Sequence, residues 1–462
     1  MIARKLLTEF EARVGKENVF HDASDRLTYS YDAAVLNPVI PALAVRPTTS
    51  EALSHAVRLC NEARIPLTVR GAGTNLSGGT VPSPGGVVVL TNALNRIIEI
   101  NEKDMYAVVE PGVVTAKLAS AVEAKGLFYP PDPGSQSVST IGGNVAENAG
   151  GLRGLKYGVT RDYVMGLHFF DVDGQPVKTG SKTVKCATGY NLTGLLVGSE
   201  GTLGVFYQII LKLIPLPKDR KAMIAVFNEL DHATETVAAI IANRIIPATL
   251  EIMDNFTIRA VEASSRAGLP VDAAALLLIE VDGHPAQVEE DTRKVSAICR
   301  DFMARDIRIA KDAAEREKIW SARRGALSAL AKIKPTLVLE DATVPRSKVP
   351  HMVRAIQEIS RKYDIAIGTF GHAGDGNLHP TILTDRRNKD EWKRVESAIS
   401  DIFDRALELG GTLSGEHGTG IAKSCFLEKE TSKATILYSR RLKAALDPNH
   451  ILNPGKIIWE ES

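Results

Sequence analysis

Two histidines in the second half of the chain have the spacing of a candidate metal site. His372 and His379 lie seven residues apart, and further along Glu416 and His417 add a carboxylate and a third imidazole. Imidazole nitrogens and carboxylate oxygens are common ligands of divalent metals. The sequence therefore indicates a metal site built from two histidines and one carboxylate. The alternative is that the histidines stand in loops and make ordinary hydrogen bonds.

The backbone between His372 and His379 decides whether both rings can reach one ion. On a single strand, residues seven apart point to opposite faces. A helix would place them on one face, but Gly374, Gly376 and Pro380 disfavour a helix. We therefore expect a glycine turn that brings both rings to the same side.

Glycine-rich segments in the first half of the chain are the second chemical feature. Residues 70–79 contain four glycines and three small polar residues, and further clusters lie at 134–158 and 198–205. Exposed backbone N–H groups in such loops bind anionic oxygens, and diphosphate is the natural ligand. The first loop is neither a Rossmann nor a Walker motif, because Leu76 stands where the third glycine should be and no Gly-Lys-Ser/Thr follows. The alternative is a long glycine-rich turn without a ligand.

Composition limits the class of protein. The 462 residues are 44% hydrophobic and 24% charged, which is typical of a soluble protein of two or three domains. A net charge of +1 gives no electrostatic case for binding nucleic acid. The apolar runs are too short for a transmembrane segment, and the first residues do not resemble a signal peptide. Four scattered cysteines without a CxxC pair predict no iron–sulfur cluster in this chain and favour the cytoplasm.

The predicted elements show which parts of the backbone position these residues. A helix is expected over 1–30, and short strands then alternate with helices through the glycine-rich half. From residue 219 glycine becomes rare, and strands alternate with long helices, one of them over 313–333. A last helix is expected over 433–446, before a Pro/Gly tail. The charged, proline-containing stretch 215–221 marks a boundary between two domains, the first rich in glycine and the second poor in glycine with long helices.

Seven motifs, in the same order along nearly the whole chain, resemble those of flavoproteins of vanillyl-alcohol oxidase type. Within that group the sequence is similar to the FAD-linked D-2-hydroxyacid dehydrogenases, a branch that includes the glycolate oxidase flavin subunit and D-lactate dehydrogenase. The motifs are RGAGTNLSGG (70–79), PPDPGS (130–135), IGGNVAENAGG (141–151), GSEGTLGV (198–205), GHAGDGNLHP (371–380), SGEHGTG (414–420) and NPGK (453–456).

The resemblance implies an α+β fold with three parts. A two-subdomain FAD-binding domain of vanillyl-alcohol oxidase/PCMH (p-cresol methylhydroxylase) type is expected over 1–218. An α+β substrate or cap domain with the metal site is expected over 219–420. Residues 421–462 are expected to form a C-terminal helix and a tail that packs back on the FAD domain.

The same resemblance implies non-covalent FAD. Relatives that attach flavin covalently use a histidine in the first glycine loop, where this chain has Thr74 and Asn75. The first loop would bind the diphosphate, the later loops would line the ribityl chain, adenine and isoalloxazine, and the tail would reach the flavin. The predicted cofactor-binding residues are Arg70, Gly71, Ala72, Gly73, Thr74, Asn75, Leu76, Ser77, Gly78, Pro131, Asp132, Pro133, Gly134, Ser135, Gly142, Gly143, Asn144, Asn148, Gly150, Glu200, Gly201, Gly204, Val205 and Asn453.

On the substrate side, His372, His379 and Glu416 resemble the ligands of a divalent metal, which is zinc, manganese or iron in relatives. Such a metal would lower the pKa of the hydroxyl group of a 2-hydroxy acid. His417 would accept the hydroxyl proton as general base, and the α-hydrogen would leave as hydride to flavin N5.

Two further side chains carry over by resemblance. Arg323 matches the carboxylate-binding arginine of the family, and its alternative is a surface arginine, with Arg324 leaving the register open. Asn377 is expected to contact the substrate or a residue of the site, and its alternative is a loop-stabilising asparagine. Leu339 stands where relatives that oxidise 2-hydroxyglutarate have a lysine. We therefore expect a small monocarboxylate such as glycolate or D-lactate.

The leading hypothesis is an FAD-dependent dehydrogenase that converts a small D-2-hydroxy acid to the 2-oxo acid. Electrons would pass to a separate acceptor protein, such as an iron–sulfur subunit or an electron-transfer flavoprotein, because this chain lacks cluster-binding cysteines. Any membrane association would then come through that partner. Alternatives are an oxidase that uses oxygen directly and a non-catalytic, flavin-bound electron-transfer subunit. A metal-binding structural module would leave the glycine loops unexplained.

Overall fold

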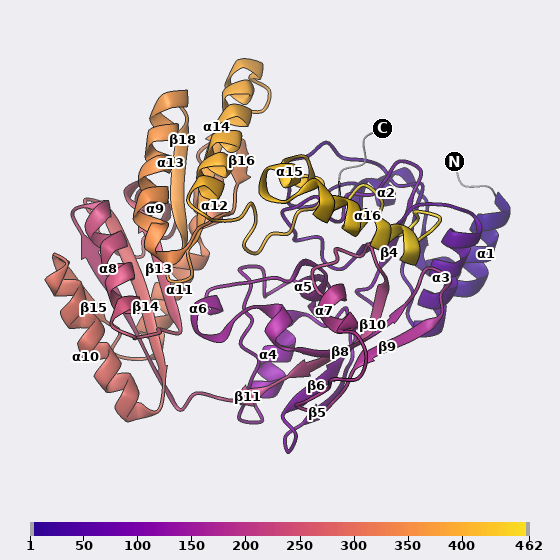
Figure 1. The fold of residues 1–462 in the computed structure, drawn as a ribbon, viewed down its shortest axis with the longest axis horizontal. Coiled ribbons are helices and arrows are strands. Elements are labelled where there is room, and N and C mark those ends of the chain that lie inside the picture. The colour runs from indigo at the N-terminus through magenta and orange to yellow at the C-terminus, as the bar shows by residue number, and fades with distance from the viewer. Residues whose placement is uncertain (1–3, 459–462) are drawn as a thin grey trace. The chain divides into compact units, whose positions relative to one another are not determined.

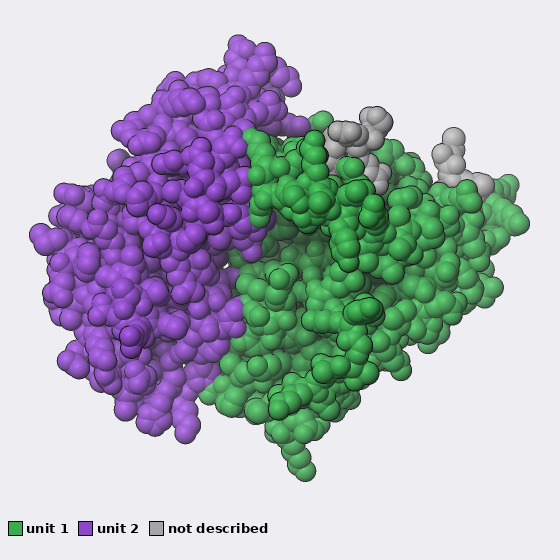
Figure 2. Space-filling model, in the orientation of Figure 1, with its two compact units in different colours: residues 1–150, 159–216, 416–462 green, residues 151–158, 217–415 purple. Residues whose placement is uncertain are grey.

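Two units make up the described part of the chain, residues 4–458, in a computed structural model (Figure 1). Within the described residues, unit 1 comprises 4–150, 159–216 and 416–458, and unit 2 comprises 151–158 and 217–415 (Figure 2). The predicted domain limits at residues 1 and 462 lie outside the described residues. The assignment of the cofactor to one unit and of the substrate to the other remains a prediction.

Unit 1 begins with a four-stranded sheet in the order β1-β2-β4-β3. Its strands are β1 (Val19–Phe20), β2 (Leu43–Val45), β3 (Leu67–Arg70) and β4 (Val87–Leu90). The strands β2, β4 and β3 are parallel, and every residue of β4 is buried, as expected for the apolar centre of a parallel sheet. Ile451 and Leu452 from the C-terminal tail join the same core, and Leu67 N–H donates to Ile451 O at 2.6 Å. The C-terminal tail therefore contributes to the core that supports β3, the strand that leads into the first glycine loop.

The remaining strands of unit 1 are antiparallel. A five-stranded sheet has the order β5-β6-β10-β8-β9, and β7 pairs with β11. These strands are β5 (Ile97–Asn101), β6 (Tyr106–Val109), β7 (Leu127–Phe128), β8 (Val164–Phe170), β9 (Pro176–Gly180), β10 (Val205–Lys212) and β11 (Ile214–Pro215). The helices of the unit are α1 (Arg4–Val14), α2 (Ala23–Thr28), α3 (Ser50–Glu62), α4 (Thr115–Glu123), α5 (Ile141–Glu147), α7 (Leu192–Leu196), α15 (Leu427–Glu430) and α16 (Lys433–Leu446).

Unit 2 is built on an eight-stranded antiparallel sheet, with the order β15-β12-β14-β13-β18-β19-β16 and β17 paired to β19. The strands are β12 (Asp219–Phe227), β13 (Thr249–Asp254), β14 (Ala275–Gly283), β15 (Asp306–Ile309), β16 (Thr336–Leu339), β17 (Ala342–Thr343), β18 (Ala366–His372) and β19 (Asn377–Thr384). The helices are α6 (Gly154–Tyr157), α8 (Leu230–Ala242), α9 (Asn255–Ser265), α10 (Pro285–Asp301), α11 (Ala313–Arg324), α12 (Ala326–Leu330), α13 (Val349–Tyr363) and α14 (Lys389–Glu408). One face of the sheet packs on α9, α11 and α12, and the other contacts α8, α10 and α13 (Figure 1).

Two helix predictions were wrong. The helix expected over 1–30 ends at Val14, because Gly15 has a φ of 94° and the chain then enters β1; residues 1–3 lie outside the described residues. The helix expected over 313–333 divides into α11 and α12 at Gly325. The predicted last helix coincides with α16, Lys433–Leu446. Among residues 4–458, no helix combines the length and apolar character needed to cross a membrane.

Candidate active site

His372 and His379 lie on adjacent strands of the unit 2 sheet. Phe370 of β18 pairs with His379 of β19, and His372 follows Phe370 by two residues, so all three side chains share a face. The two imidazole rings are 5.1 Å apart between centroids and nearly perpendicular. Gly376 makes the connecting turn with a φ of +90°, where a Cβ would lie 2.0 Å from Val344 O. The expected turn that brings both rings to one side is confirmed.

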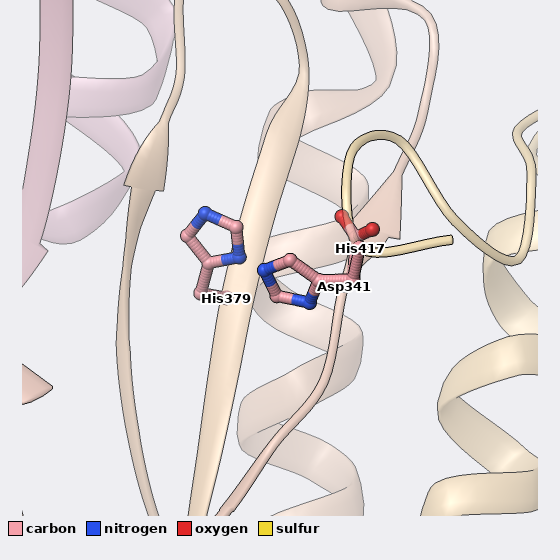
Figure 3. Close-up of side chains that lie close together, drawn as sticks. All are labelled: Asp341, His379 and His417. Atoms are coloured by element: carbon pink, nitrogen blue, oxygen red, sulfur yellow. The ribbon is translucent and has the colours of Figure 1, made fainter. Parts of the chain in front are cut away.

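The donor atoms on this face suit a divalent cation. Ring nitrogens of His372 and His379 lie within 4.8 Å of one another, and an Asp341 carboxylate oxygen lies within the same distance of a His379 nitrogen. Both histidines and Asp341 are buried. Figure 3 shows the side chains of His379 and Asp341, and it also labels His417, which belongs to unit 1. Two imidazoles beside a carboxylate form the donor set that zinc, manganese and iron accept.

Asp341 anchors the chain that leaves unit 2. Its Oδ1 accepts a 2.7 Å hydrogen bond from Asn377 Nδ2, and its Oδ2 accepts a 2.8 Å bond from Ser414 Oγ. A Cβ at Gly415 would lie 2.1 Å from Asn377 Nδ2, so only glycine allows this close approach. Asn377 Oδ1 is buried and has no hydrogen-bond partner among the described residues. Asn377 thus stabilises this loop, while one of its polar atoms is available to a ligand.

Arg323 is buried, with 6% of its surface exposed, on the last turn of α11. Its Nε and Nη2 lie 2.7 and 2.6 Å from Glu251 Oε2, and its guanidinium stacks 4.6 Å from the centroid of the Phe370 ring. Arg324 instead pairs with Glu317 near the surface. Arg324 is therefore the surface arginine. Arg323 lies beside the histidine hairpin, the pair of strands β18 and β19 that carries His372 and His379.

Glu416 and His417 are the first two residues of the last segment of unit 1. Their side chains approach each other at 3.8 Å, between His417 Nε2 and Glu416 Oε1. A Cβ at Gly150 would lie 2.4 Å from Glu416 Oε2, so Glu416 packs against a predicted cofactor residue. Further along, the backbone N–H groups of Ile421 and Ala422 both donate to Ser77 O. The segment thus lies across the predicted cofactor loops.

The first glycine loop is organised from within by charged side chains. Arg70 ends β3, and its Nη1 donates to Tyr31 O at 2.6 Å and Thr80 Oγ1 at 3.3 Å. Asp32 Oδ2 accepts from Asn75 Nδ2 at 2.7 Å and from Thr80 N–H at 3.3 Å. Burial raises the pKa of Asp32, although these hydrogen bonds and the nearby Arg70 act in the opposite direction. Side chains therefore hold this loop in its conformation.

A cavity of about 410 Å³ lies beside this loop in unit 1. That volume is within the range of ligand pockets. The lining residues include Arg70, Gly71, Ala72, Lys117 and Thr140. The lining combines residues of the glycine loop with two cationic residues, Arg70 and Lys117, which suits an anionic group such as a diphosphate.

Gly134 gives a second indication of a cofactor. A Cβ built there would meet nothing within 4 Å, and its φ lies outside the left-handed region. Residues 4–458 therefore give no steric reason for glycine at this position, whereas a ligand lying against the backbone would give one. The cavity, the loop and Gly134 together fit the predicted FAD.

Glu200 and Asn453 tie the other predicted cofactor segments together. The Glu200 carboxylate accepts from the N–H groups of Thr419 and Gly420 at 2.7 and 2.8 Å. Burial raises the pKa of Glu200 to about 7, although those two hydrogen bonds and nearby lysines lower it. Asn453 Nδ2 donates to the carbonyl oxygens of Gly79 and Glu200, and its Oδ1 accepts from Thr68. Asn453 therefore joins strand β3 to two loops, and its contact with the flavin remains a prediction.

The other predicted cofactor residues all lie in unit 1. Asn144 lies on α5 and donates to Thr115 Oγ1 at 2.8 Å, while Asn148 ends α5 with a φ of 55°. The rest are placed on the first loop (Gly73, Thr74, Leu76, Ser77, Gly78), between β7 and α5 (Pro131, Asp132, Pro133, Ser135), on and after α5 (Gly142, Gly143, Gly150), and at the start of β10 (Gly201, Gly204, Val205).

Three acidic residues of these sites were not predicted from the sequence. Asp32 supports the first loop, Asp341 anchors Ser414 and Asn377, and Glu251 bonds both His372 and Arg323. Glu251 interrupts the apolar run of a strand whose other residues up to Met253 are apolar or threonine. A charged residue inside a buried strand indicates that it has a specific partner. This signal could have marked Glu251 in the sequence as a candidate site residue.

Comparison with known proteins places the chain among flavoenzymes. Residues 216–457 match the family described as "FAD linked oxidases, C-terminal domain", and residues 41–180 match "FAD binding domain". The chain is 50% identical over 462 residues to "Glycolate oxidase subunit GlcD" of Bacillus subtilis, covering 100% of this chain and 98% of that protein. It is 34% identical over 437 residues to "D-lactate dehydrogenase" of Anaerostipes hadrus, covering 93% and 92% respectively.

Two solved structures share the fold. The structure of p-cresol methylhydroxylase with substrate bound aligns with a TM-score of 0.81 at 18% identity, covering 98% of this chain and 96% of that one. The 4-ethylphenol oxidase from Gulosibacter chungangensis aligns with a TM-score of 0.80 at 19% identity, covering 99% and 97%. At these identities the similarity shows the architecture alone.

Proposed function

Because the chain belongs to the FAD-linked oxidases of the D-2-hydroxyacid dehydrogenase branch, with the vanillyl-alcohol oxidase/PCMH-type fold, we propose that it oxidises a small 2-hydroxy acid with the help of a divalent metal. One observation carries this proposal. Ser414 is bonded to Asp341 beside the histidine hairpin, and residues 416–422 lie on the predicted cofactor loops. Glu416 and His417 therefore connect the candidate metal site with the candidate cofactor site through a few covalent bonds.

The metal is proposed to bind His372, His379 and Glu416. The two histidines share one face of the sheet, and Glu416 follows Ser414 by two residues, a span of about 7 Å at most. Asp341 is less suited as a ligand because both of its oxygens accept hydrogen bonds. When bound, the metal supplies a Lewis acid that lowers the pKa of the substrate hydroxyl.

The remaining steps belong to side chains of this chain. His417, next to Glu416, accepts the hydroxyl proton as general base. Arg323 orients the substrate by donating hydrogen bonds to its carboxylate. Asn377 offers the substrate its Oδ1 as a hydrogen-bond acceptor, because this atom has no partner among the described residues. Oxidation breaks the O–H and C–H bonds and forms the C=O bond of the 2-oxo acid; the electron pair and hydrogen of the C–H bond leave together. Bound FAD supplies the two-electron acceptor for that pair.

The substrate is proposed to be a small monocarboxylate, such as glycolate or D-lactate. Leu339 ends β16 and is packed against the apolar cluster that contains Phe370 and Leu383. Leucine has no charge with which to pair a second carboxylate. D-2-Hydroxyglutarate should therefore reduce the flavin far more slowly than D-lactate, and comparable rates for the two acids would contradict this assignment.

Electrons are proposed to leave through a separate protein. The chain has four cysteines without a CxxC pair, so it offers no ligand set for an iron–sulfur cluster. Its relative in Bacillus subtilis is named a subunit of glycolate oxidase, which supports an acceptor in another chain. The acceptor class, an iron–sulfur subunit or an electron-transfer flavoprotein, can be tested by mixing substrate-reduced enzyme with each and following flavin reoxidation.

The general base gives the most direct test by mutation. His417→Gln should retain FAD and metal but slow anaerobic flavin reduction by D-lactate at least about 100-fold, the usual scale of general-base catalysis. His351→Gln, at an exposed position on α13, is the matched control and should reduce at the normal rate. Flavin reduction by His417→Gln at the normal rate would exclude His417 as the base.

A further inference from the structure

Glu251 is a fully buried carboxylate that contacts two residues of the candidate substrate site. It lies on β13, two residues before Met253, which pairs with Phe370 of β18. Its Oε1 is 2.6 Å from His372 Nδ1, and its Oε2 is 2.7 Å from Arg323 Nε and 2.6 Å from Arg323 Nη2. Each oxygen therefore serves a different partner.

These contacts compensate for the burial of Glu251. The residue lies inside the apolar face that packs on α9, α11 and α12. A buried carboxylate is strongly unfavourable unless it is paired, and here both oxygens are paired.

The contact with His372 determines which ring nitrogen can bind metal. Because Nδ1 faces Glu251 at 2.6 Å, His372 would bind a metal through Nε2. A carboxylate behind a metal-binding histidine fixes the ring orientation and increases its basicity. The contact with Arg323 determines which edge of the guanidinium is free. Of the five N–H donors of an arginine, Nε and one hydrogen of Nη2 face Glu251, and the outer edge with Nη1 is left for a second carboxylate.

We infer that Glu251 is a positioning residue that fixes the distance between the metal site and the carboxylate-binding arginine. A 2-hydroxy acid offers its hydroxyl to the metal and its carboxylate to Arg323, so one substrate molecule must meet both groups at once. Glu251 bonds both His372 and Arg323. This inference rests on the proposed function and assigns Glu251 a role that is exerted through His372 and Arg323.

Glu251→Gln tests the inference without turnover. The carboxamide offers one acceptor oxygen, so it can serve His372 or Arg323 but not both. Zn²⁺ affinity, measured by competition with a chromophoric chelator, should fall 10- to 100-fold. Glu280→Gln is the matched control, because Glu280 is a buried glutamate on the neighbouring strand β14 that bonds Trp320 of α11 at 2.7 Å. It should bind Zn²⁺ like the unmodified protein.

The outcomes separate the two proposals. If the unmodified protein binds no Zn²⁺, the metal-assisted function fails. If the unmodified protein binds Zn²⁺ and Glu251→Gln binds it equally well, or if Glu280→Gln loses as much affinity, the positioning role is wrong. Glu251→Asp preserves the charge but is one methylene shorter, so it covers the case in which Glu251→Gln does not fold. Normal Zn²⁺ affinity in a folded Glu251→Asp protein would also overturn the inference.

Discussion

Replacement of Arg323 by lysine should weaken substrate binding without unfolding the protein. Lysine restores a positive charge beside the fully buried Glu251, so no uncompensated carboxylate is left in the sheet. A single ammonium group directed at Glu251 cannot also present the outer guanidinium edge to a substrate carboxylate. The prediction therefore separates binding of the substrate from stability of the fold.

The magnitude follows from the donors that are lost. The edge of Arg323 that Glu251 leaves free can make two charge-assisted hydrogen bonds to a carboxylate, each worth about 1.5 to 3 kcal/mol. The loss of two bonds at the lower value is about 3 kcal/mol, or about 150-fold in substrate affinity. Because the buried charge pair is retained, the thermal midpoint should fall by only a few degrees.

Anaerobic stopped-flow measurement of flavin reduction across a range of D-lactate concentrations gives the dissociation constant and the limiting rate separately. Arg324→Lys is the control, since Arg324 pairs with Glu317 near the surface, where such pairs contribute about 0 to 1 kcal/mol. Arg324→Lys should bind D-lactate within twofold of the unmodified protein. The assignment of the carboxylate site to Arg323 is refuted if the dissociation constant of Arg323→Lys for D-lactate stays within threefold of the unmodified value. It is also refuted if Arg324→Lys loses more affinity than Arg323→Lys.

Three further predictions concern unit 1. Gly134→Ala should weaken FAD at least tenfold in a fluorescence titration while the thermal midpoint of the FAD-free protein stays unchanged, because its Cβ would meet no protein atom within 4 Å; unchanged FAD affinity would show that the cofactor does not lie there. The pKa of Glu200 is raised from 4.5 to about 7 by burial, so the folded state retains a proton that the unfolded state releases between these values. Stability against urea should therefore fall by up to about 3 kcal/mol as the pH rises through this window. The fall should be smaller in Glu200→Gln, where the buried Glu147, whose pKa is also raised, still titrates; an unchanged pH dependence in that variant would count against the shift. Lys443→Met should destabilise the protein by about 3 kcal/mol, because Lys443 pairs with the fully buried Asp447 and donates to Thr202 O and Leu452 O at 2.8 and 2.6 Å. A free energy of unfolding within 0.5 kcal/mol of the unmodified value, on the scale of an ordinary surface substitution, would exclude that role.

The sequence was sufficient where local chemistry determines local structure. Gly374 and Gly376 indicated a turn that brings His372 and His379 to one face, and the glycine-rich segment 70–79 indicated the loop that follows β3. That this loop binds a ligand remains a prediction. Residue 325 shows the limit of such reasoning. The apolar periodicity continues across Gly325, but the chain there ends α11 and starts α12.

The supporting carboxylates could not be located from spacing. Glu251 is 121 residues from His372 and 72 from Arg323, and Asp341 is 73 residues from Ser414. Only the pairing of β13 with β18 brings Glu251 to the histidine, and only the packing of α11 on that face brings the arginine. Such contacts are set by tertiary structure, so a single acidic residue in a strand indicates that a partner exists without identifying it.

The visible absorption spectrum of the FAD-supplemented protein under anaerobic conditions tests metal-assisted hydroxy-acid oxidation most directly. The spectrum is recorded before and after addition of D-lactate, and again with protein that has been treated with a chelator. The proposal predicts that the flavin band bleaches with D-lactate, fails to bleach after chelation, and bleaches again once Zn²⁺ or Mn²⁺ is restored. A flavin band that is indifferent to both D-lactate and glycolate would contradict the proposed reaction, and bleaching that is unaffected by chelation would contradict the role of the metal.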